Sequence, residues 1–468
     1  MFAVICLFLV SIVFEAVESV NRNKKFYIYE FSNYISDSWP KDYNHHRLAI
    51  DKHFRSNSGA GVVIDERNCL FYTHQYTLFT LFYERLKTSE HRTFSEEEAD
   101  LFFVPYDLGM DSSTRKSDGA LVQTNCPNMD EVIKLLQSSK YFSESYGANH
   151  FLVHSINQMM IYYANLKCQR LYEFCFNCSK LSIDTYPPGI FTFLDTHPAM
   201  TNNWVSIPFP SNYHYHGRCD APPWLFDGSN RTIAAGRMED KTPQWFATYR
   251  YRRPYSICFM GSTKVTAKKQ MQLRKRLISL CRHLTQTISY FSCLVVHLSS
   301  HESSANTIQA ARDTIPSQSV NRSDGNPPFP TTSNVYTMCR FCLMPGGDFP
   351  TRKGFLDAML SGCIPVTFQR IAAQQQWPLH WGSVDTADEC TVYVPMQEMM
   401  KRNASLVLKQ LNTMATEDHQ FIEGKLECIS KVGFRMQYSL PNAFHDQERF
   451  RNELDAFDIA LGYLFMDS

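Results

Sequence analysis

The sequence predicts an α/β protein built on parallel sheets, and three observations support this fold class. Short apolar segments with strand character alternate with segments whose apolar residues repeat at helical spacing, which is typical of a parallel, doubly wound sheet. One compact strand–loop–helix–strand pattern spans residues 340–368. The chain has 468 residues, too many for one ordinary core, so two or three domains of about 100–200 residues are expected.

Composition restricts the broad class of the protein. Hydrophobic residues make up 44% of the chain and aromatic residues 14%, so a large core can form and global disorder is excluded. The 46 Lys and Arg residues balance the 46 Asp and Glu residues, which disfavours a nucleic-acid-binding protein because that class carries a net basic surface. No apolar run reaches the roughly 18 residues of a membrane-spanning helix, so a polytopic membrane protein is excluded.

The N-terminal segment, residues 1–20, has the pattern of a signal peptide or signal anchor. Phe2–Phe14 is almost wholly apolar and ends at Glu15, and a run of about 13 residues fits the apolar region of a signal peptide better than a full span. Basic residues follow this run and none precedes it. Because basic residues flanking a membrane anchor tend to stay in the cytoplasm, this argues against an anchor whose C-terminal part lies on the far side of the membrane. The alternative is a buried strand or helix at an untargeted N-terminus. We expect entry into the secretory pathway.

The cysteine content is compatible with disulfides. Removal of Cys6 with the signal segment leaves 14 of the 15 cysteines, an even number. Two CxxC pairs occur, but they lie too far apart for a zinc ribbon, so buried thiols or local disulfides are expected rather than zinc: Cys175/Cys178 and Cys339/Cys342. Four sequons permit N-glycosylation, at Asn177, Asn230, Asn321 and Asn403.

Strand and helix patterns alternate in the first half of the chain. Lys25–Phe31 is rich in β-forming residues and alternates, which predicts a strand. Tyr76–Leu86 has apolar residues at helical spacing. Leu101–Val104 and Phe151–Val153 are short apolar runs typical of buried parallel strands.

A domain boundary is predicted at Arg250–Pro254, where a charged stretch precedes a new strand, Tyr255–Met260. Lys264–Leu284 predicts a basic amphipathic helix, Ile288–Leu298 a further strand, and Ser299–Asn334 a polar surface loop. A phosphate or nucleic-acid site is one interpretation of the basic run, but such runs are more often solvated helix faces. The run comprises Lys268, Lys269, Arg274, Lys275 and Arg276.

The following region carries the clearest functional pattern. Arg340–Pro345 predicts a strand, Lys353–Ser361 a helix and Ile364–Phe368 a second buried strand, and the tail closes with a helix over Glu453–Phe465. In parallel α/β units, ligands bind beyond the carboxyl ends of strands, where loops meet helix N-termini. The loop at 346–353 is therefore the first candidate for a ligand site.

This loop has the residue types that a nucleotide diphosphate requires. Gly346 and Gly347 allow close approach of the backbone, and Thr351 can cap the helix whose N-terminus attracts an anion. Arg352 and Lys353 add positive charge. A further carboxylate, Asp357, can hold a ribose hydroxyl, as acidic residues do in dinucleotide sites. The alternative is a helix N-terminus with solvated charges.

The same residues resemble the signature of the exostosin domain, glycosyltransferase family 47, in particular its plant xyloglucan galactosyltransferase branch. The matching strings are FCLMPGGD at 341–348, PTRK at 350–353 and DAMLSGCIPV at 357–366. Further similar strings occur in the same order along residues 25–465: FYIYEF, EEADLFFVPYD, NHFLV, IPFP, RPYSICFMGS, TVYVP and DAFDIAL.

The resemblance implies a GT-B-like α/β architecture, with two Rossmann-like domains whose parallel sheets face a cleft. It implies an N-terminal acceptor-side domain at residues 25–250, a C-terminal nucleotide-sugar-binding domain at 251–440 and a C-terminal helix at 441–468. It also implies an inverting glycosyltransferase that takes a nucleotide sugar, usually UDP-linked, and works in the Golgi lumen. No metal or other cofactor is expected.

An inverting transfer needs a general base and a stabilised leaving group. We expect Arg352, Lys353 and the helix N-terminus to stabilise the diphosphate, and Asp357 to bind the ribose. His150 occupies the family's Asn/Asp-His-Phe/Leu position and is the first candidate for the base, with a hydrogen-bonded structural histidine as the alternative. Asp107 and Asp348 are the competing carboxylates, and Asp348 can instead cap its own turn. His154 is expected to be structural.

Three functions follow. The first is transfer of a sugar, galactose by analogy with the plant branch, from a UDP-sugar to a polysaccharide or glycan in the secretory pathway. The second is a catalytically inactive scaffold subunit within a glycosyltransferase complex. The third is a secreted glycan-binding protein. One fold supports transfer of several sugars, so the sequence does not select the donor or the linkage.

Overall fold

The computed structural model describes residues 23–30, 56–66, 69–111, 113–115, 121–123, 126, 128–163, 166–186, 198–216, 253–297, 335–383, 385–441 and 454–467. The predicted signal segment, the predicted loop at 299–334 and most of the predicted boundary at 250–254 lie outside these residues. Within the described ranges, no helix combines the length and apolar character that crossing a membrane requires.

The chain forms two compact units that interleave along the sequence. Unit 1 takes Met1–Gly61, Thr73–Pro210 and Ser439–Ser468, and unit 2 takes Val62–Tyr72 and Ser211–Tyr438. This division differs from the predicted domains at three places. The hairpin within Val62–Tyr72 belongs to unit 2. The chain passes from unit 1 to unit 2 after residue 210 rather than at residue 250. The C-terminal helix is part of unit 1.

Unit 1 is built on a six-stranded parallel sheet with the order β10-β9-β8-β5-β1-β4. The apolar side chains of its central strands are fully buried, as in parallel sheets covered on both faces. A separate antiparallel hairpin, β6–β7, also lies in this unit. The strands are β1 (Phe26–Ile28), β4 (Arg92–Thr93), β5 (Leu101–Phe103), β6 (Ser113–Arg115), β7 (Leu121–Gln123), β8 (His150–His154), β9 (Ser179–Ser182) and β10 (Trp204–Ser206).

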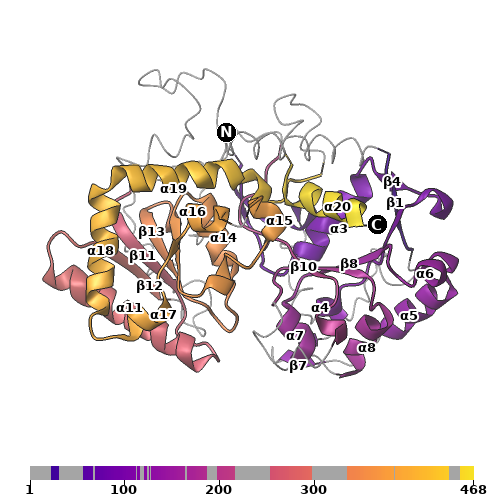
Figure 1. Cartoon of the computed structure of the whole chain (residues 1–468), viewed down its shortest axis with the longest axis horizontal. Coiled ribbons are helices and arrows are strands. Elements are labelled where there is room, and N and C mark those ends of the chain that lie inside the picture. Colours follow the sequence, from indigo (N-terminus) through magenta and orange to yellow (C-terminus); the bar gives the residue numbers. More distant parts are fainter. Residues whose placement is uncertain are drawn as a thin grey trace, which may run out of the picture. The chain divides into compact units, whose positions relative to one another are not determined.

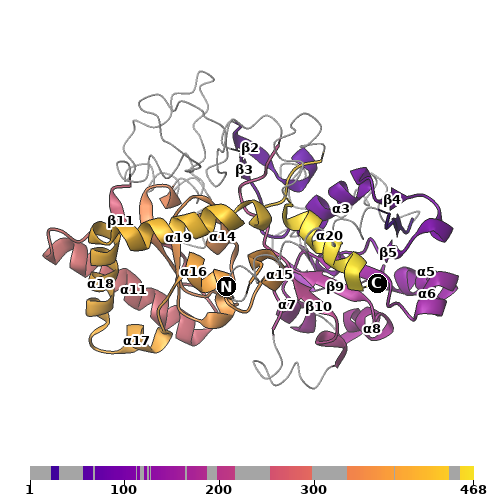
Figure 2. The same ribbon diagram turned by 45° about the horizontal axis from the view of Figure 1, so that its top comes forward.

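The helices of unit 1 connect successive strands, and α20 at the end of the chain lies beside α3 (Figures 1 and 2). Parallel crossovers are right-handed, so connections that run in opposite directions along the sheet place their helices on opposite faces. The helices are α3 (Leu78–Thr88), α4 (Leu108–Asp111), α5 (Met129–Ser138), α6 (Lys140–Ser145), α7 (Gln158–Tyr163), α8 (Leu166–Phe174) and α20 (Ala456–Asp467), with 3₁₀ turns at Asn57–Gly59, Glu96–Glu98 and Pro198–Met200.

Unit 2 contains a five-stranded parallel sheet with the order β12-β11-β13-β14-β15 and an antiparallel hairpin, β2–β3. Its central strands carry the apolar runs that the sequence analysis identified as buried strands. The strands are β2 (Val62–Asp65), β3 (Leu70–Tyr72), β11 (Tyr255–Gly261), β12 (Cys293–His297), β13 (Cys339–Met344), β14 (Ile364–Thr367) and β15 (Val392–Tyr393).

Helices cover both faces of the unit 2 sheet, with α11 and α18 on one side and α14 and α16 on the other (Figure 1). The helix α11 joins β11 to β12 and α14 joins β13 to β14, and these crossovers run in opposite directions from the centre of the sheet. The helices are α11 (Lys268–Thr287), α14 (Lys353–Leu360), α15 (Pro378–Trp381), α16 (Thr386–Cys390), α17 (Met396–Met400), α18 (Ala404–Glu417) and α19 (His419–Val432), with 3₁₀ turns at Arg370–Ala372 and Phe434–Met436.

Disulfides tie the strands of unit 2 to their neighbours. Within the described residues, one bond lies in unit 1 and four lie in unit 2. The predicted CxxC pair Cys339/Cys342 is neither a zinc site nor a local disulfide, because each cysteine is bonded to a different, distant partner. The bonds are Cys126–Cys168, Cys258–Cys339, Cys281–Cys293, Cys342–Cys363 and Cys390–Cys428.

The α/β class with parallel sheets is confirmed, and the predicted elements are present with shifts of a few residues at their ends. The predicted strand at Ile288–Leu298 is the largest change, because α11 extends to Thr287 and β12 begins only at Cys293. Such shifts are expected because hydrophobic periodicity defines the interior of an element better than its ends.

Candidate functional site

The strand order of unit 2 places a ligand site between two of its strands. Numbered by position in the chain, the five strands run 2-1-3-4-5 across the sheet, so the order reverses between β11 and β13. In open α/β sheets, ligands bind beyond the carboxyl ends of the strands at this reversal. Here β11 ends at Gly261 and β13 ends at Met344, immediately before the predicted glycine loop.

Arg274 of α11 reaches across to this loop. Its guanidinium donates from Nε to the carbonyl of Gly346 at 2.8 Å, from Nη1 to Ser262 at 2.6 Å and from Nη2 to Pro345 at 3.3 Å. The side chain is buried, and burial together with the charge of Arg352 lowers its pKa to about 9. Arg274 is therefore still charged at neutral pH.

Arg352 approaches the same place from the start of α14. Its Nη2 donates to the carbonyl of Met260 at 3.0 Å, and its Nη1 lies 3.4 Å from the carbonyl of Pro345. A side-chain hydrogen bond with the buried Tyr336 holds the guanidinium from the other side. The predicted contact of Arg352 with a diphosphate is thus compatible with its position at the carboxyl ends of β11 and β13.

The two guanidinium groups converge at Gly261, the last residue of β11. A Cβ placed on this glycine would lie 3.5 Å from Nη1 of Arg274 and 3.5 Å from Nη1 of Arg352. No ion pair joins either arginine to a carboxylate among the residues that the structure covers, and Asp348 is the acidic residue whose charge acts on Arg274. Two cations held close together by carbonyl groups favour a bound anion.

The glycine pair forms the floor of this site. A Cβ on Gly347 would lie 3.4 Å from Nη2 of Arg274, so a larger residue would press against that guanidinium. A Cβ on Gly346 would come within 3.1 Å of both Gln270 and Gln369, which hydrogen-bond to each other at 2.6 Å. The space that a side chain would need at these two glycines is therefore occupied by protein side chains, and the predicted approach to a ligand stays a prediction.

Lys353 and Asp357 are engaged with each other. They lie one helical turn apart on α14, and Lys353 Nζ is 2.9 and 2.7 Å from the two carboxylate oxygens. The remaining bond of Nζ goes to Asn212 Oδ1 at 2.6 Å, and the backbone amide of Asn212 donates to Asp357 Oδ1 at 2.7 Å. Asp357 is 2% exposed.

This ion pair corrects the predicted roles of both residues. An ammonium group has three donors, and all three of Lys353 are used within unit 2, so it has none left for a phosphate. Asp357 is buried beneath Lys353 and the backbone of Asn212, where it fixes α14 rather than presenting a free carboxylate to a ribose. The sequence could not show this because Asn212 is 141 residues away from Lys353.

Two further loop predictions change in detail. Arg352, not Thr351, occupies the N-cap position of α14, and no side chain caps this helix. Thr351 is buried. Asp348 does not cap its own turn but accepts the backbone amide of Thr266 at 2.6 Å and its hydroxyl at 2.8 Å. This contact ties the glycine loop to the start of α11, and it makes Asp348 a positioning residue for the loop.

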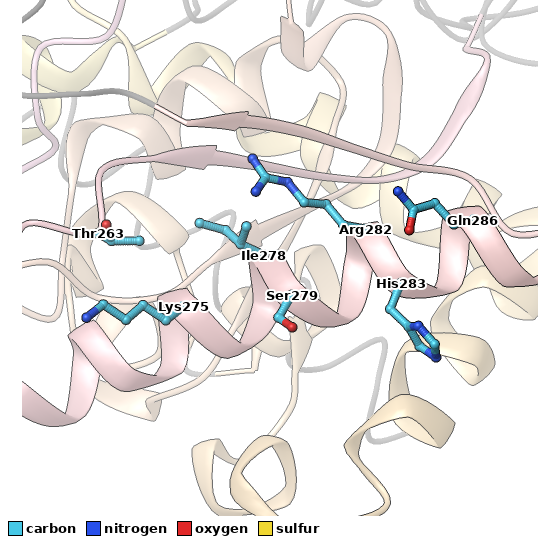
Figure 3. A pocket seen from close by; sticks show the side chains of 7 residues that line it. All are labelled: Thr263, Lys275, Ile278, Ser279, Arg282, His283 and Gln286. Carbon is cyan, nitrogen blue, oxygen red and sulfur yellow. The ribbon is translucent and has the colours of Figure 1, made fainter.

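The basic run of α11 divides between two sides of the helix. Arg274 alone of that run faces the core, where it shares the helical spacing of Leu273, Leu277 and Cys281. That spacing was the signal by which the sequence could have singled it out. Lys275 of the same run instead lines an open hollow of about 570 Å³ beside the helix (Figure 3). None of the predicted donor-binding residues is among those that line it: Thr263, Lys275, Ile278, Ser279, Arg282, His283 and Gln286.

In unit 1, Asp107 follows the carboxyl end of β5, where the strand order also reverses between β1 and β5. Its Oδ1 accepts the amide of Gly109 at 3.0 Å, and its Oδ2 has no hydrogen-bond partner within 3.5 Å among the described residues. Burial raises the pKa of Asp107 to about 7, although interactions with Ser155 and Gly109 partly oppose the rise. A carboxyl with this pKa can accept a proton near neutral pH.

His150 stands at the opposite edge of the same sheet. It is the first residue of β8, at the amino end of the strand, and it is 1% exposed. Its Nε2 bonds to the hydroxyl of Tyr29 and its Nδ1 to the side chain of Asn149, both at 2.8 Å. Burial lowers its pKa to about 3. The structure therefore favours a structural histidine, and the expectation that His150 is the base is corrected.

His154 ends β8 at the carboxyl edge and is fully buried between Tyr172 and Trp204. Burial and the charge of Lys180 lower its pKa to about 3. It is neutral at physiological pH and lies in an aromatic environment, as a structural residue would. Its ring nitrogens have no hydrogen-bond partner in the described part of the chain.

The chain thus forms two doubly wound α/β units, and in unit 2 the glycine loop meets Arg274 and Arg352 at the topological switch point. The chain belongs to the exostosin GT47 family, since the Exostosin GT47 domain matches residues 21–410.

Relatives with similar sequences come from Arabidopsis thaliana. The chain is 23% identical to xyloglucan-specific galacturonosyltransferase 1 over 84% of this chain and 49% of that protein. It is 22% identical to a probable xyloglucan galactosyltransferase, GT15, over 90% of this chain and 76% of that protein. The chain thus spans about half the length of the first relative. Among solved structures, the pneumococcal O-GlcNAc transferase GtfA with UDP and GlcNAc overlaps 70% of this chain and 60% of its own, at 10% identity and a TM-score of 0.33.

Proposed function

We propose that the protein is an inverting glycosyltransferase that moves a sugar from a UDP-sugar to a polysaccharide. Family membership supports the class of reaction. The convergence of Arg274 and Arg352 at Gly261 supports the donor, because two guanidinium groups without carboxylate partners match the two negative groups of a diphosphate. This convergence is the observation that carries the proposal.

The arginines act on the leaving group in this proposal. As the bond between the sugar and the diphosphate breaks, negative charge grows on the β-phosphate oxygens. Fixed donors aimed at that charge lower the barrier because they need no reorganisation during the reaction. Arg274 and Arg352 are fixed in this sense, since each already donates to strand-end carbonyls that set its orientation. In this proposal the two positive charges stabilise the leaving diphosphate, as a divalent cation does in other transferases, so the proposed reaction requires no cofactor.

For the general base we propose Asp107. Inversion by one in-line displacement requires a group that accepts the proton of the acceptor hydroxyl as the hydroxyl attacks, an effect of about 10²–10⁴-fold. Asp107 has a pKa raised to about 7 by burial and one carboxylate oxygen without a protein partner among the described residues. Asp348 is less suited to this role, because its carboxylate is used by Thr266.

The sugar and compartment follow by analogy. The named relatives transfer galactose or galacturonic acid to xyloglucan, and we propose a galactosyl donor and a β-glucan-type or related glycan as the acceptor. The disulfides support folding in an oxidising compartment, which is compatible with the lumen of the secretory pathway and the Golgi.

The proposal is tested by ligand-linked stabilisation of the purified full chain against a panel of UDP-sugars. A donor at 100 times its Kd is expected to stabilise the protein by about 2.7 kcal/mol. Arg274→Ala and Arg352→Ala are each expected to weaken binding about 10- to 100-fold, since hydrogen bonds to charged groups contribute about 1.5–3 kcal/mol. Lys275→Ala, next to Arg274 but exposed, is the matched control and should bind normally.

Two outcomes would contradict the proposal. If no UDP-sugar stabilises the wild-type chain, donor binding fails and the inactive scaffold becomes the better interpretation. If UDP-sugars bind and both arginine variants bind as tightly as Lys275→Ala, the donor site lies elsewhere. Product analysis with a bound donor and xyloglucan oligosaccharides then reports the stereochemistry at the anomeric carbon, and retention there would exclude the inverting mechanism.

A further inference from the structure

Cys175 and Cys178 form a close pair at the end of α8. The helix ends at Phe174, and the chain then turns so that the amide of Cys178 donates to the carbonyl of Cys175 at 3.1 Å. Such a four-residue turn brings its end Cα atoms within about 7 Å, which is near the separation that disulfides require. The neighbouring Cys178 and burial together raise the pKa of Cys175 well above its ordinary value.

The pair is set apart from the other cysteines of the structure. Both thiols are free and fully buried, whereas the remaining cysteines of the described residues are disulfide-bonded. A chain with this many disulfides folds under oxidising conditions, so these two thiols meet the same oxidants whenever the turn opens. Among the described cysteines, Cys175 and Cys178 are therefore the two that can still form a disulfide with each other.

A buried cation lies beside the two sulfurs. Lys180 Nζ donates to the carbonyls of Phe176, Cys178 and Asn202 at 2.8–3.1 Å and is in no ion pair with a described carboxylate. Burial lowers the pKa of this lysine to about 8, and the two thiols act in the opposite direction. The charge of Lys180 favours the thiolate of Cys175, the reactive form of cysteine, although burial and Cys178 outweigh it while the turn is closed.

We propose that Cys175 and Cys178 are a redox-active pair that closes to a disulfide, and opens again, by exchange with small disulfides and thiols of the glutathione type. The argument rests on the turn that joins the two cysteines, on their being free thiols among disulfide-bonded cysteines, and on the ammonium of Lys180 bound to the carbonyls of that turn. It is independent of the proposed sugar transfer.

Glutathione disulfide is the oxidant, and it accepts the two electrons that the protein thiols lose when they form a disulfide. The thiolate of one cysteine attacks a sulfur of glutathione disulfide, the S–S bond of the oxidant breaks, and one glutathione thiolate leaves. The second cysteine loses its proton and attacks the mixed disulfide, which releases the second glutathione. Two protein thiols become one disulfide, and one glutathione disulfide becomes two glutathione thiols. The reverse sequence reopens the pair.

Access to the buried sulfurs requires only a local opening of the turn. Its two middle residues, Phe176 and Asn177, are exposed. Side-chain hydrogen bonds hold the turn in place, from Asn177 to the carbonyl of Tyr146 and from Lys180, Asn202 and Asn203 to carbonyls of the turn. Exposed turns of this kind open at much lower cost than the sheet beneath them.

The pair is tested on the native full-length protein in glutathione buffers of defined ratio. Free thiols are alkylated, the protein is digested without reduction, and the peptide that contains both cysteines is weighed. We expect this peptide to change from the doubly alkylated to the disulfide form as glutathione disulfide increases, while Cys126–Cys168 stays closed throughout. Lys180→Met is expected to slow closure about tenfold, as a shift of one unit in a thiol pKa changes the thiolate fraction tenfold.

Controls separate exchange from a structural role. Lys134→Met removes an exposed lysine of the same unit and should leave the closure rate unchanged. Cys178→Ser should accumulate a mixed disulfide with glutathione at Cys175, which needs no intact pair and is visible even if Lys180→Met folds poorly. The proposal is overturned if the native pair remains alkylatable at every glutathione ratio. It is equally overturned if the pair is disulfide-bonded from the start and opens only when Cys126–Cys168 opens.

Discussion

Asp107, the proposed general base, lowers the stability of the fold when its carboxyl is ionised. Its carboxyl is 1% exposed and has no cationic partner, so ionisation in the folded state is opposed by burial. The rise of its pKa from 3.8 to about 7 corresponds to about 4 kcal/mol of preference for the neutral form. Buried carboxyls with raised pKa values are concentrated in functional sites, where proton transfer requires them.

We predict that Asp107→Asn stabilises the protein at neutral pH and abolishes activity. The folded pKa is raised, so the wild type loses stability as pH increases from about 4 to about 7, while the asparagine variant does not titrate. The stability difference should be near zero at pH 4 and grow to at most about 4 kcal/mol above pH 7. Urea unfolding of both proteins across this pH range measures it.

The exposed Asp130→Asn, in the same unit, is the matched control and should show little pH-dependent difference. A stability gap between wild type and Asp107→Asn that is constant with pH would contradict the raised pKa. Full activity of Asp107→Asn would remove Asp107 from the mechanism and leave the base unidentified.

At the scale of elements, α20 depends on contacts with a helix more than 350 residues earlier in the chain. Arg85 of α3 binds both Asp455 and Asp458, which stand at and just inside the start of α20. Asp455 also accepts the amides of the first turn, at 2.9 and 3.0 Å, so it caps the helix and holds the arginine together. The guanidinium lies 4.5 Å from the centre of the Phe457 ring.

We predict that Arg85→Met destabilises unit 1 by about 3–5 kcal/mol, because it leaves the fully buried Asp455 without its cation. Hydrogen exchange of α20 should accelerate together with that of α3, and the urea midpoint should fall. The control is Lys87→Met on the same helix, whose ion pair with Glu84 is exposed and contributes less than about 1 kcal/mol. Equal effects of the two substitutions would show that the ion pair does not hold α20.

Across the whole molecule, covalent stabilisation is unequal between the two units. Unit 2 holds four of the five disulfides described, and two of them join β11 and β13 to neighbouring elements at the switch point. Each native disulfide contributes about 2–4 kcal/mol. Among its described residues, unit 1 has one disulfide, an apolar core and the cluster around Arg85.

Reduction is therefore expected to loosen unit 2 before unit 1. After incubation with dithiothreitol under native conditions, hydrogen exchange should rise most in β11 to β15, and stabilisation by UDP-sugar should be lost. Exchange in β1, β5 and β8 should change little. Protein that has been alkylated but not reduced provides the baseline, and a uniform rise in both units would show that the disulfides do not distribute stability in this way.

Much of the architecture could be predicted from sequence because it follows from local pattern. Apolar runs such as Leu101–Val104 and Ile364–Phe368 became buried parallel strands, and α14 begins where the glycine loop predicted a helix. The exostosin strings identified the family and the loop that carries the site. In each case the information lies within a few neighbouring residues, because strand and helix periodicity are properties of the local chain.

The pairing of side chains was decided only by the tertiary structure. Lys353 and Asp357 are neutralised by each other and fixed by Asn212 from a distant segment, while Arg274 reaches the glycine loop from another helix and remains without a carboxylate partner. Sequence shows that a charge exists, but its availability depends on which groups from elsewhere in the chain meet it and how much water remains. For this reason the family was evident from the residues alone, whereas our proposal of Arg274 in place of Lys353, and of Asp107 in place of His150, required the fold.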